Sequence, residues 1–216
     1  MHLKVLNKAT TFLLYLEQKF GIYFNSFIVS FILLCCAAIY VTPSIAPMEL
    51  GRGYASLTID PFDFSEQNNL RYRILTPFMA YCLGLRGSLY IVFPLIIASL
   101  FLSAIYFYIR KTQTPSESLL ITMVICFSSP ILFLLHFQGY VDVTSYLLIL
   151  LIIIFIKKIY VWTPLMTLLL LNHESNVFII PGLLYFYNIN TPNKAKVAFS
   201  AILGFTFALI PFLLYQ

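Results

Sequence analysis

The sequence predicts an all-α protein, a polytopic helical membrane bundle with about seven transmembrane helices, and three observations support this class. First, 61% of the 216 residues are hydrophobic and only 10% are charged, whereas soluble domains carry about 25% charged residues. Second, long apolar runs alternate with short charged clusters. Third, the continuous apolar run 147–156 excludes a membrane β-barrel, whose strands alternate apolar and polar residues. We expect residues 1–216 to form a single integral membrane domain.

The first two elements are a surface helix and a transmembrane span. Residues 1–20 place leucines and Phe20 near one helical face and lysines elsewhere, which is typical of an interfacial helix lying on the membrane. The first span is predicted at 22–41 and ends before Pro43.

Residues 44–86 are predicted to form an extracytoplasmic loop followed by a juxtamembrane helix. The stretch 44–73 is rich in charged residues. The following stretch, 74–85, is apolar but short and is interrupted by Pro77. Because a span needs about 20 residues, we expect this segment to stay at the interface or to insert only halfway.

Residues 88–215 are predicted to form the bundle proper. The run from Thr114 to Glu117 predicts a helix start, since threonine caps, proline takes the first turn and glutamate occupies the third position. Spans five and six are short, so they could instead form a re-entrant pair. The predicted spans are 88–109, 116–135, 140–156, 159–171, 177–187 and 197–215.

The basic residues predict the orientation. If 74–85 does not cross and the N-terminus is cytoplasmic, nine of the thirteen basic residues lie inside, as the positive-inside rule requires. The net charge of +5 is therefore interpreted as a topology signal, and no nucleic-acid partner is expected. The nine residues are Lys4, Lys8, Lys19, Arg110, Lys111, Lys157, Lys158, Lys194 and Lys196.

Two residue types carry simpler expectations. The four cysteines lie in apolar stretches without metal-site spacing, so we expect small buried hydrophobes. Tyr160 and Trp162 follow Lys158 and are expected to form an interfacial aromatic belt.

This orientation places most acids and two histidines on the extracytoplasmic side, where ionisable groups at membrane depth suggest a functional site. Arginine suits phosphate through its bidentate fork, and carboxylates suit general-base catalysis or a divalent cation such as Mg²⁺ or Mn²⁺. The expected pocket-lining residues are Glu66, His136, Asp142, His173 and Glu174.

Plainer roles remain open for these residues. Asp142 could serve only the dipole of its helix, the loop acids could be solvated, and the loop arginines could only anchor to lipid headgroups. Residues 172–176 form a run of hydrogen-bonding side chains between two apolar runs, and this exceeds the needs of a turn.

The loop carries two further motifs. Asp60-Pro61-Phe62-Asp63 is followed by Asn69-Leu70-Arg71-Tyr72-Arg73-Ile74-Leu75-Thr76-Pro77. With these motifs and the span order, the chain resembles the GT-C class of membrane glycosyltransferases, which use polyprenyl-phosphate-linked sugars at the extracytoplasmic face. The positions Gly139 to Asp142 and His173-Glu174 look like later acidic positions in related bacterial membrane proteins. The resemblance is architectural and covers most of the chain.

The resemblance implies sugar transfer from a polyprenyl-phosphate donor in a bacterial inner membrane. Asp63 or Asp60 would be the general base. Arg71 and Arg73 would hold the donor phosphate. Asp63 and Glu174 are the candidate ligands of a divalent cation.

Three other functions compete with this interpretation. A lipid or solute carrier or flippase would use prolines beside polar clusters to break its helices, although the second, third and seventh predicted spans show no polar groups reaching through the bilayer. An intramembrane metal-dependent hydrolase would use His136, Asp142, His173 and Glu174 as ligands. A non-catalytic assembly protein is the remaining option.

Overall fold

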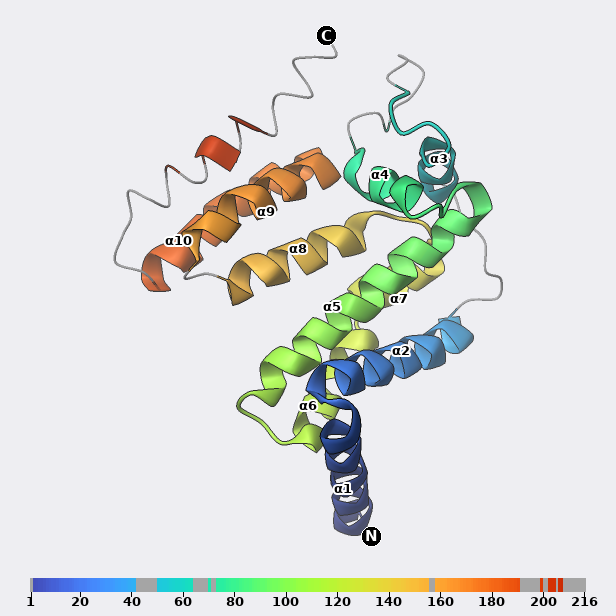
Figure 1. Ribbon diagram of the computed structural model, residues 1–216, viewed down its shortest axis with the longest axis vertical. Coiled ribbons are helices and arrows are strands. Elements are labelled where there is room, and N and C mark those ends of the chain that lie inside the picture. Colours follow the sequence, from blue (N-terminus) through green and yellow to red (C-terminus); the bar gives the residue numbers. More distant parts are fainter. Residues whose placement is uncertain are drawn as a thin grey trace.

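The computed structural model describes residues 2–41, 50–63, 70, 73–155, 158–190, 199, 202–204 and 206–207. All regular secondary structure in these ranges is helical, so the predicted all-α class is confirmed for the described part of the chain. Figure 1 shows the helices packed as a bundle, with α1 projecting from one end.

The first two helices match the predicted ranges closely. α1 covers His2–Phe20 and α2 covers Ile22–Val41. Gly21 separates them with a φ of 82°, a left-handed conformation that side chains other than hydrogen disfavour. The chain therefore turns sharply between the surface helix and the first span (Figure 1).

The predicted loop contains two short helices. α3 covers Leu50–Leu57 and α4 covers Leu75–Cys82. α4 has 8 residues, or about 12 Å at 1.5 Å per residue. It is too short to cross a hydrocarbon core of about 30 Å, in agreement with the interfacial assignment.

The predicted second span consists of a short 3₁₀ helix that continues into a long α-helix. η1 covers Gly87–Ile91 and α5 covers Val92–Arg110. Thr114 then caps α6, Pro115–Cys126, because its hydroxyl accepts from the Glu117 amide while Glu117 accepts from the Thr114 amide. The predicted capping box is confirmed.

The predicted third span is bent. α6 is followed by α7, Ser129–His136, and the two axes differ by 52°. The break falls at Phe127 and Ser128, just before Pro130. Proline lacks an amide hydrogen, and its ring clashes with the carbonyl four residues before it, so α6 cannot continue through Pro130 and the bend follows from the sequence.

The last described elements are α8, Asp142–Ile154, α9, Ile159–Asn172, η2, Glu174–Ile179, and α10, Ile180–Asn190. The helices contact one another in the order α2, α5, α8, α9, and Figure 1 shows α8 lying between α5 and α9.

The prediction of about seven transmembrane helices is wrong. Among the described residues, only Ile22–Val41 and Gly87–Arg110 are long and apolar enough to cross a membrane, and the bent pair α6–α7 adds a third if it counts as one span. α8 and α9 have 13 and 14 residues, or about 20 Å. Their apolar composition is typical of spans, but each helix ends before it reaches the length of about 20 residues that a span needs. Most of the predicted span 197–215 lies outside the described residues.

Two simpler expectations also need correction. Trp162 is 0% exposed and packs in the core between α8 and α9 with Ile152 and Met166, so only Tyr160, at 73% exposed, fits an aromatic belt. Of the cysteines, only Cys126 is buried; the exposed ones are Cys35, Cys36 and Cys82. An apolar stretch does not specify which of its residues face lipid.

Candidate functional site

The site begins with a close contact between two glycines. A Cβ added to Gly51 at the start of α3 would lie 2.2 Å from the carbonyl oxygen of Gln138. Gly139 follows in the loop between α7 and α8, with a φ of 97°. Only hydrogen fits between these backbones, so α3 docks directly on the loop that leads to Asp142.

A second anchor joins α3 to η1. The Thr58 hydroxyl accepts a hydrogen bond from the Gly87 amide at 2.8 Å and donates to the Ala55 carbonyl at 2.7 Å. Thr58 is 0% exposed. The segment of α3 and Thr58 therefore contacts both the start of the α5 span and the loop that precedes α8.

These anchors bring together four side chains, which we call the arginine–tyrosine cluster: Tyr54 of α3, Arg73 before α4, Tyr90 of η1 and Asp142 of α8. The Arg73 guanidinium donates to the Tyr54 hydroxyl at 2.9 Å. The Tyr90 hydroxyl lies within electrostatic range of both the Tyr54 hydroxyl and the Asp142 carboxylate. Arg73 thus contacts Tyr54, and Asp142 interacts electrostatically with Tyr90.

Tyr90 is the unusual member of the arginine–tyrosine cluster. Its side chain is 0% exposed, and its hydroxyl has no hydrogen-bond partner among the described residues. A buried unpaired hydroxyl costs about 1–3 kcal/mol, so such groups are uncommon and mark places where a ligand or water binds. Together, the four side chains can offer hydrogen-bond donors to a phosphate and a carboxylate to a hydroxyl proton.

A buried polar network holds α4, α8 and α9 together behind the cluster. Thr76 donates to the Asn172 side-chain oxygen and lies 2.8 Å from the Thr144 hydroxyl. The Asn172 side-chain amide donates to the Val141 carbonyl at 3.0 Å and to Ser145 at 2.8 Å. All of these side chains are at most 4% exposed. Since Val141 directly precedes Asp142, the network holds the backbone at the start of α8.

The predicted loop residues lie apart from this network. Asp60 is exposed, and one of its carboxylate oxygens accepts from the Phe62 amide at 3.2 Å in a turn that follows α3. Asp63 is also exposed. Glu66 and Arg71 lie outside the described residues. The roles of Asp60 and Asp63 as catalytic acids stay predictions.

The remaining predicted site residues are placed as follows. His136 is exposed in the last turn of α7, with its ring edge-on to Phe137. His173 caps η2, since its Nδ1 accepts from the Ser175 amide at 3.2 Å. The side chain of Glu174 lies outside the described part of the structure, so its predicted approach to Asp142 stays a prediction.

The cation prediction rests on residues that the structure describes only in part. Among the described residues, no three His, Cys, Asp or Glu side chains converge as metal ligands do.

A separate set of polar contacts joins α5 to α1 and α2, and we call it the polar seam. Its members are Glu17, Ser26, Ser103, Tyr106 and Arg110. Arg110 holds Glu17 of α1 through contacts of 3.1–3.3 Å, and Tyr106 donates to the same carboxylate at 3.2 Å. Deeper along the seam, the hydroxyls of Ser26 and Ser103 lie 2.9 Å apart. The second span therefore carries serines that turn inward, since Ser99 is buried and Ser103 contacts Ser26. The expectation that its polar groups do not reach through the bilayer stays a prediction.

Sequence reasoning missed Tyr54 and Tyr90. Tyr54 belongs to a buried face of α3, together with Gly51 and Ala55, and the spacing of these residues is helical. The stretch was interpreted as a polar loop because of its charges, so this short amphipathic signal was overlooked.

Comparison of the chain with protein-family models, curated proteins and solved structures finds no match.

Proposed function

We propose that the protein transfers a sugar from a polyprenyl-phosphate donor at the extracytoplasmic face of a membrane. The observations that carry the proposal are the hydrogen bond from Arg73 to buried Tyr54 and the buried hydroxyl of Tyr90, which interacts electrostatically with both Tyr54 and Asp142. An arginine to bind a phosphate leaving group and a carboxylate to accept a proton are the two groups that this reaction needs. The resemblance to GT-C enzymes and the membrane-spanning helices support the same class.

In this proposal, Arg73 and the Tyr90 hydroxyl bind the donor phosphate. The acceptor hydroxyl attacks the anomeric carbon of the sugar, and the bond from that carbon to the phosphate oxygen breaks. The bonding electron pair leaves with the phosphate, whose charge Arg73 stabilises. The proton of the acceptor hydroxyl passes to a carboxylate.

Two positions compete for the role of that carboxylate. The geometry favours Asp142, which interacts electrostatically with Tyr90, as does Tyr54, the residue that accepts the hydrogen bond of Arg73. The resemblance favours Asp63 or Asp60, which lie in an exposed turn. We assign the general base to Asp142, with the loop acids as the alternative that the experiment decides.

The test is turnover by the full chain in liposomes that contain polyprenyl-phosphate-linked sugars, measured as release of polyprenyl phosphate. A general base contributes about 10²–10⁴-fold, so Asp142→Asn should lower the rate by at least about 100-fold. Glu117→Gln is the matched control, because this acid only completes the cap of α6.

Loss of turnover in an Asp60→Asn, Asp63→Asn double variant, with normal turnover in Asp142→Asn, would move the base to the loop. Transport of the lipid without release of polyprenyl phosphate would favour the carrier function instead, for which the polar seam is the supporting feature. Equal turnover in all variants would overturn the proposal.

A further inference from the structure

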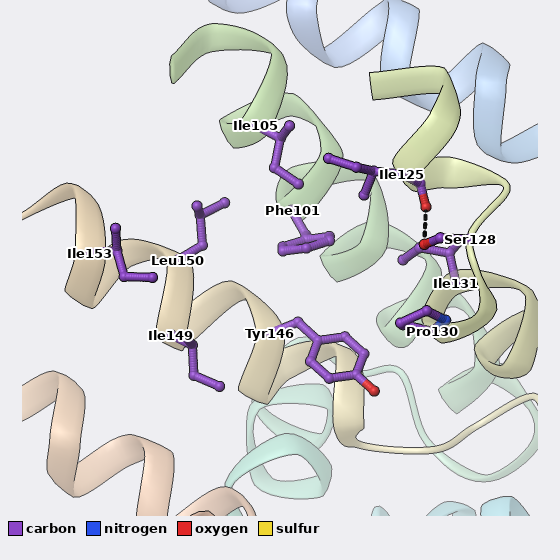
Figure 2. A pocket seen from close by; sticks show the side chains of 10 residues that line it. All are labelled: Phe101, Ile105, Ile125, Ser128, Pro130, Ile131, Tyr146, Ile149, Leu150 and Ile153. Carbon is purple, nitrogen blue, oxygen red and sulfur yellow. Dashed lines mark hydrogen bonds between the residues drawn. The ribbon is translucent and has the colours of Figure 1, made fainter. Parts of the chain in front are cut away.

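An apolar groove of about 420 Å³ lies where α5, α6, α7 and α8 meet. Each helix contributes to its wall, for example through Phe101, Ile125, Ile131 and Ile149. Figure 2 shows the side chains of α8 facing those of α5 and α6 across the open space. The wall is almost entirely hydrocarbon, and the Ser128 hydroxyl is already bonded to the Ile125 carbonyl at 2.6 Å.

The bend between α6 and α7 accounts for the groove. The two axes diverge by 52°, and both Ser128 and Pro130 at the break line the space. An empty apolar space forfeits the dispersion contacts of its wall. In a membrane, the solvent that can restore those contacts is hydrocarbon.

We propose that this groove binds one acyl chain of a phospholipid from the leaflet at the Arg110 end of α5. Phe101 lies ten residues before Lys111 on the same helix, or about 15 Å at 1.5 Å per residue. This distance equals half of a hydrocarbon core of about 30 Å. A chain whose headgroup lies level with exposed Lys111 therefore reaches the deep end of the groove. The Lys111 ammonium, which lies over the rings of Phe107 and Tyr108, supplies the positive charge at that level for the headgroup phosphate.

The groove is separate from the proposed donor site. Tyr90 lies eleven residues before Phe101, or about 16 Å along the span, toward the opposite end. A lipid whose phosphate binds Arg73 belongs to the other leaflet. The phospholipid site is thus a second lipid site, and its existence does not depend on the proposed sugar transfer.

The first experiment uses the unmodified chain. It is reconstituted in nanodiscs with a phosphatidylglycerol whose acyl chain carries a diazirine at mid-chain, and it is then photolysed. We expect cross-links to peptides that contain Phe101, Ile125 or Ile149. Cross-links confined to other surfaces would overturn the proposal.

The second experiment counts phospholipids that remain on the detergent-purified chain in native mass spectra. Ile149→Trp fills the groove and should lower occupancy at least fivefold. Val124→Trp is the matched control, because Val124 neighbours Ile125 on α6 but is 63% exposed and does not line the groove. Equal occupancy in wild type and Ile149→Trp, or polyprenyl phosphate in place of phospholipid, would overturn the assignment.

Discussion

Thr76 and Asn172 illustrate how single polar residues define this fold. Thr76 is 0% exposed, as is Asn172, yet they belong to helices almost one hundred residues apart in sequence. Their hydrogen bonds replace those that water would provide. In a membrane, such bonds select one arrangement of helices, because apolar surfaces alone do not distinguish a neighbouring helix from lipid.

Thr76→Val tests this role at the residue scale. Valine preserves the shape but leaves the Asn172 oxygen without its donor and removes the contact with Thr144, so we expect a loss of about 2 kcal/mol in stability. The measurement is unfolding of the purified chain by titration with sodium dodecyl sulfate.

The matched control for this substitution is Thr122→Val. Thr122 is equally buried, but its hydroxyl bonds only the Ser118 carbonyl of its own helix, at 2.8 Å. Its loss should cost under about 1 kcal/mol. Equal losses in the two variants would show that the network between helices adds nothing specific.

The sequence predicted some of these residues but not their partners. The polar run 172–176 was recognised as more than a turn, and Asn172 and Asn176 are indeed buried. They serve, however, as cross-links, since Asn176 donates to Ser145 and to the Leu169 carbonyl, both at 2.8 Å. Local sequence indicates that a polar group needs a partner, but only the packed helices determine which partner it meets.

At the scale of elements, the docking of α3 depends on two glycines. Gly51→Ala would place a methyl carbon 2.2 Å from a backbone oxygen, and backbone cannot move aside as cheaply as a flexible side chain. We expect α3 to shift and Tyr54 to leave Arg73. The cost should be at least about 1–3 kcal/mol, with a loss of activity.

Gly182→Ala is the control for this element. Gly182 lies in the first turn of α10, and a Cβ added there meets nothing within 4 Å. Alanine also favours helix by up to about 1 kcal/mol, so stability should stay equal or rise. If unfolding titrations show the same change for both variants, the contact between α3 and the α7–α8 loop is not tight.

Helix boundaries were predictable where local signals are strong. The cap at Thr114, the break at Gly21 and the limits of α2 all follow from side-chain or backbone preferences near the boundary. The number of crossings was not predictable from apolar runs, because α8 and α9 are as apolar as true spans but only about 20 Å long. Hydropathy indicates only that a segment lies in an apolar environment. A short apolar helix packed in the bundle shares that environment with a helix long enough to cross the membrane.

At the scale of the whole molecule, the predicted sidedness requires that α2, α5 and the bent pair α6–α7 each cross the membrane. They place Asp60 and Gly139 on one side and Thr112 on the other if each crosses once. The positive-inside rule assigns Thr112 to the cytoplasm. The predicted cytoplasmic location of Lys158 extends the same map to the α8–α9 connection.

Single cysteines in a variant that lacks the native four test this map. In intact cells, an impermeant thiol reagent should label positions 60 and 139 strongly and positions 112 and 158 only after permeabilisation. Strong labelling of position 158 from outside would reverse the placement of α8 and α9 and remove the argument for a site open to the exterior.

The central claim is that the arginine–tyrosine cluster binds the phosphate of a polyprenyl lipid, and native mass spectrometry of the purified chain tests it most directly. Arg86→Gln is the matched control, because Arg86 is exposed and stacks on Tyr81 at 4.0 Å, away from the cluster. We predict that polyprenyl phosphate remains bound to wild type and to Arg86→Gln, and that Arg73→Gln retains at least tenfold less. Absence of polyprenyl phosphate from the wild-type protein after its addition, or equal retention by Arg73→Gln, would contradict the claim.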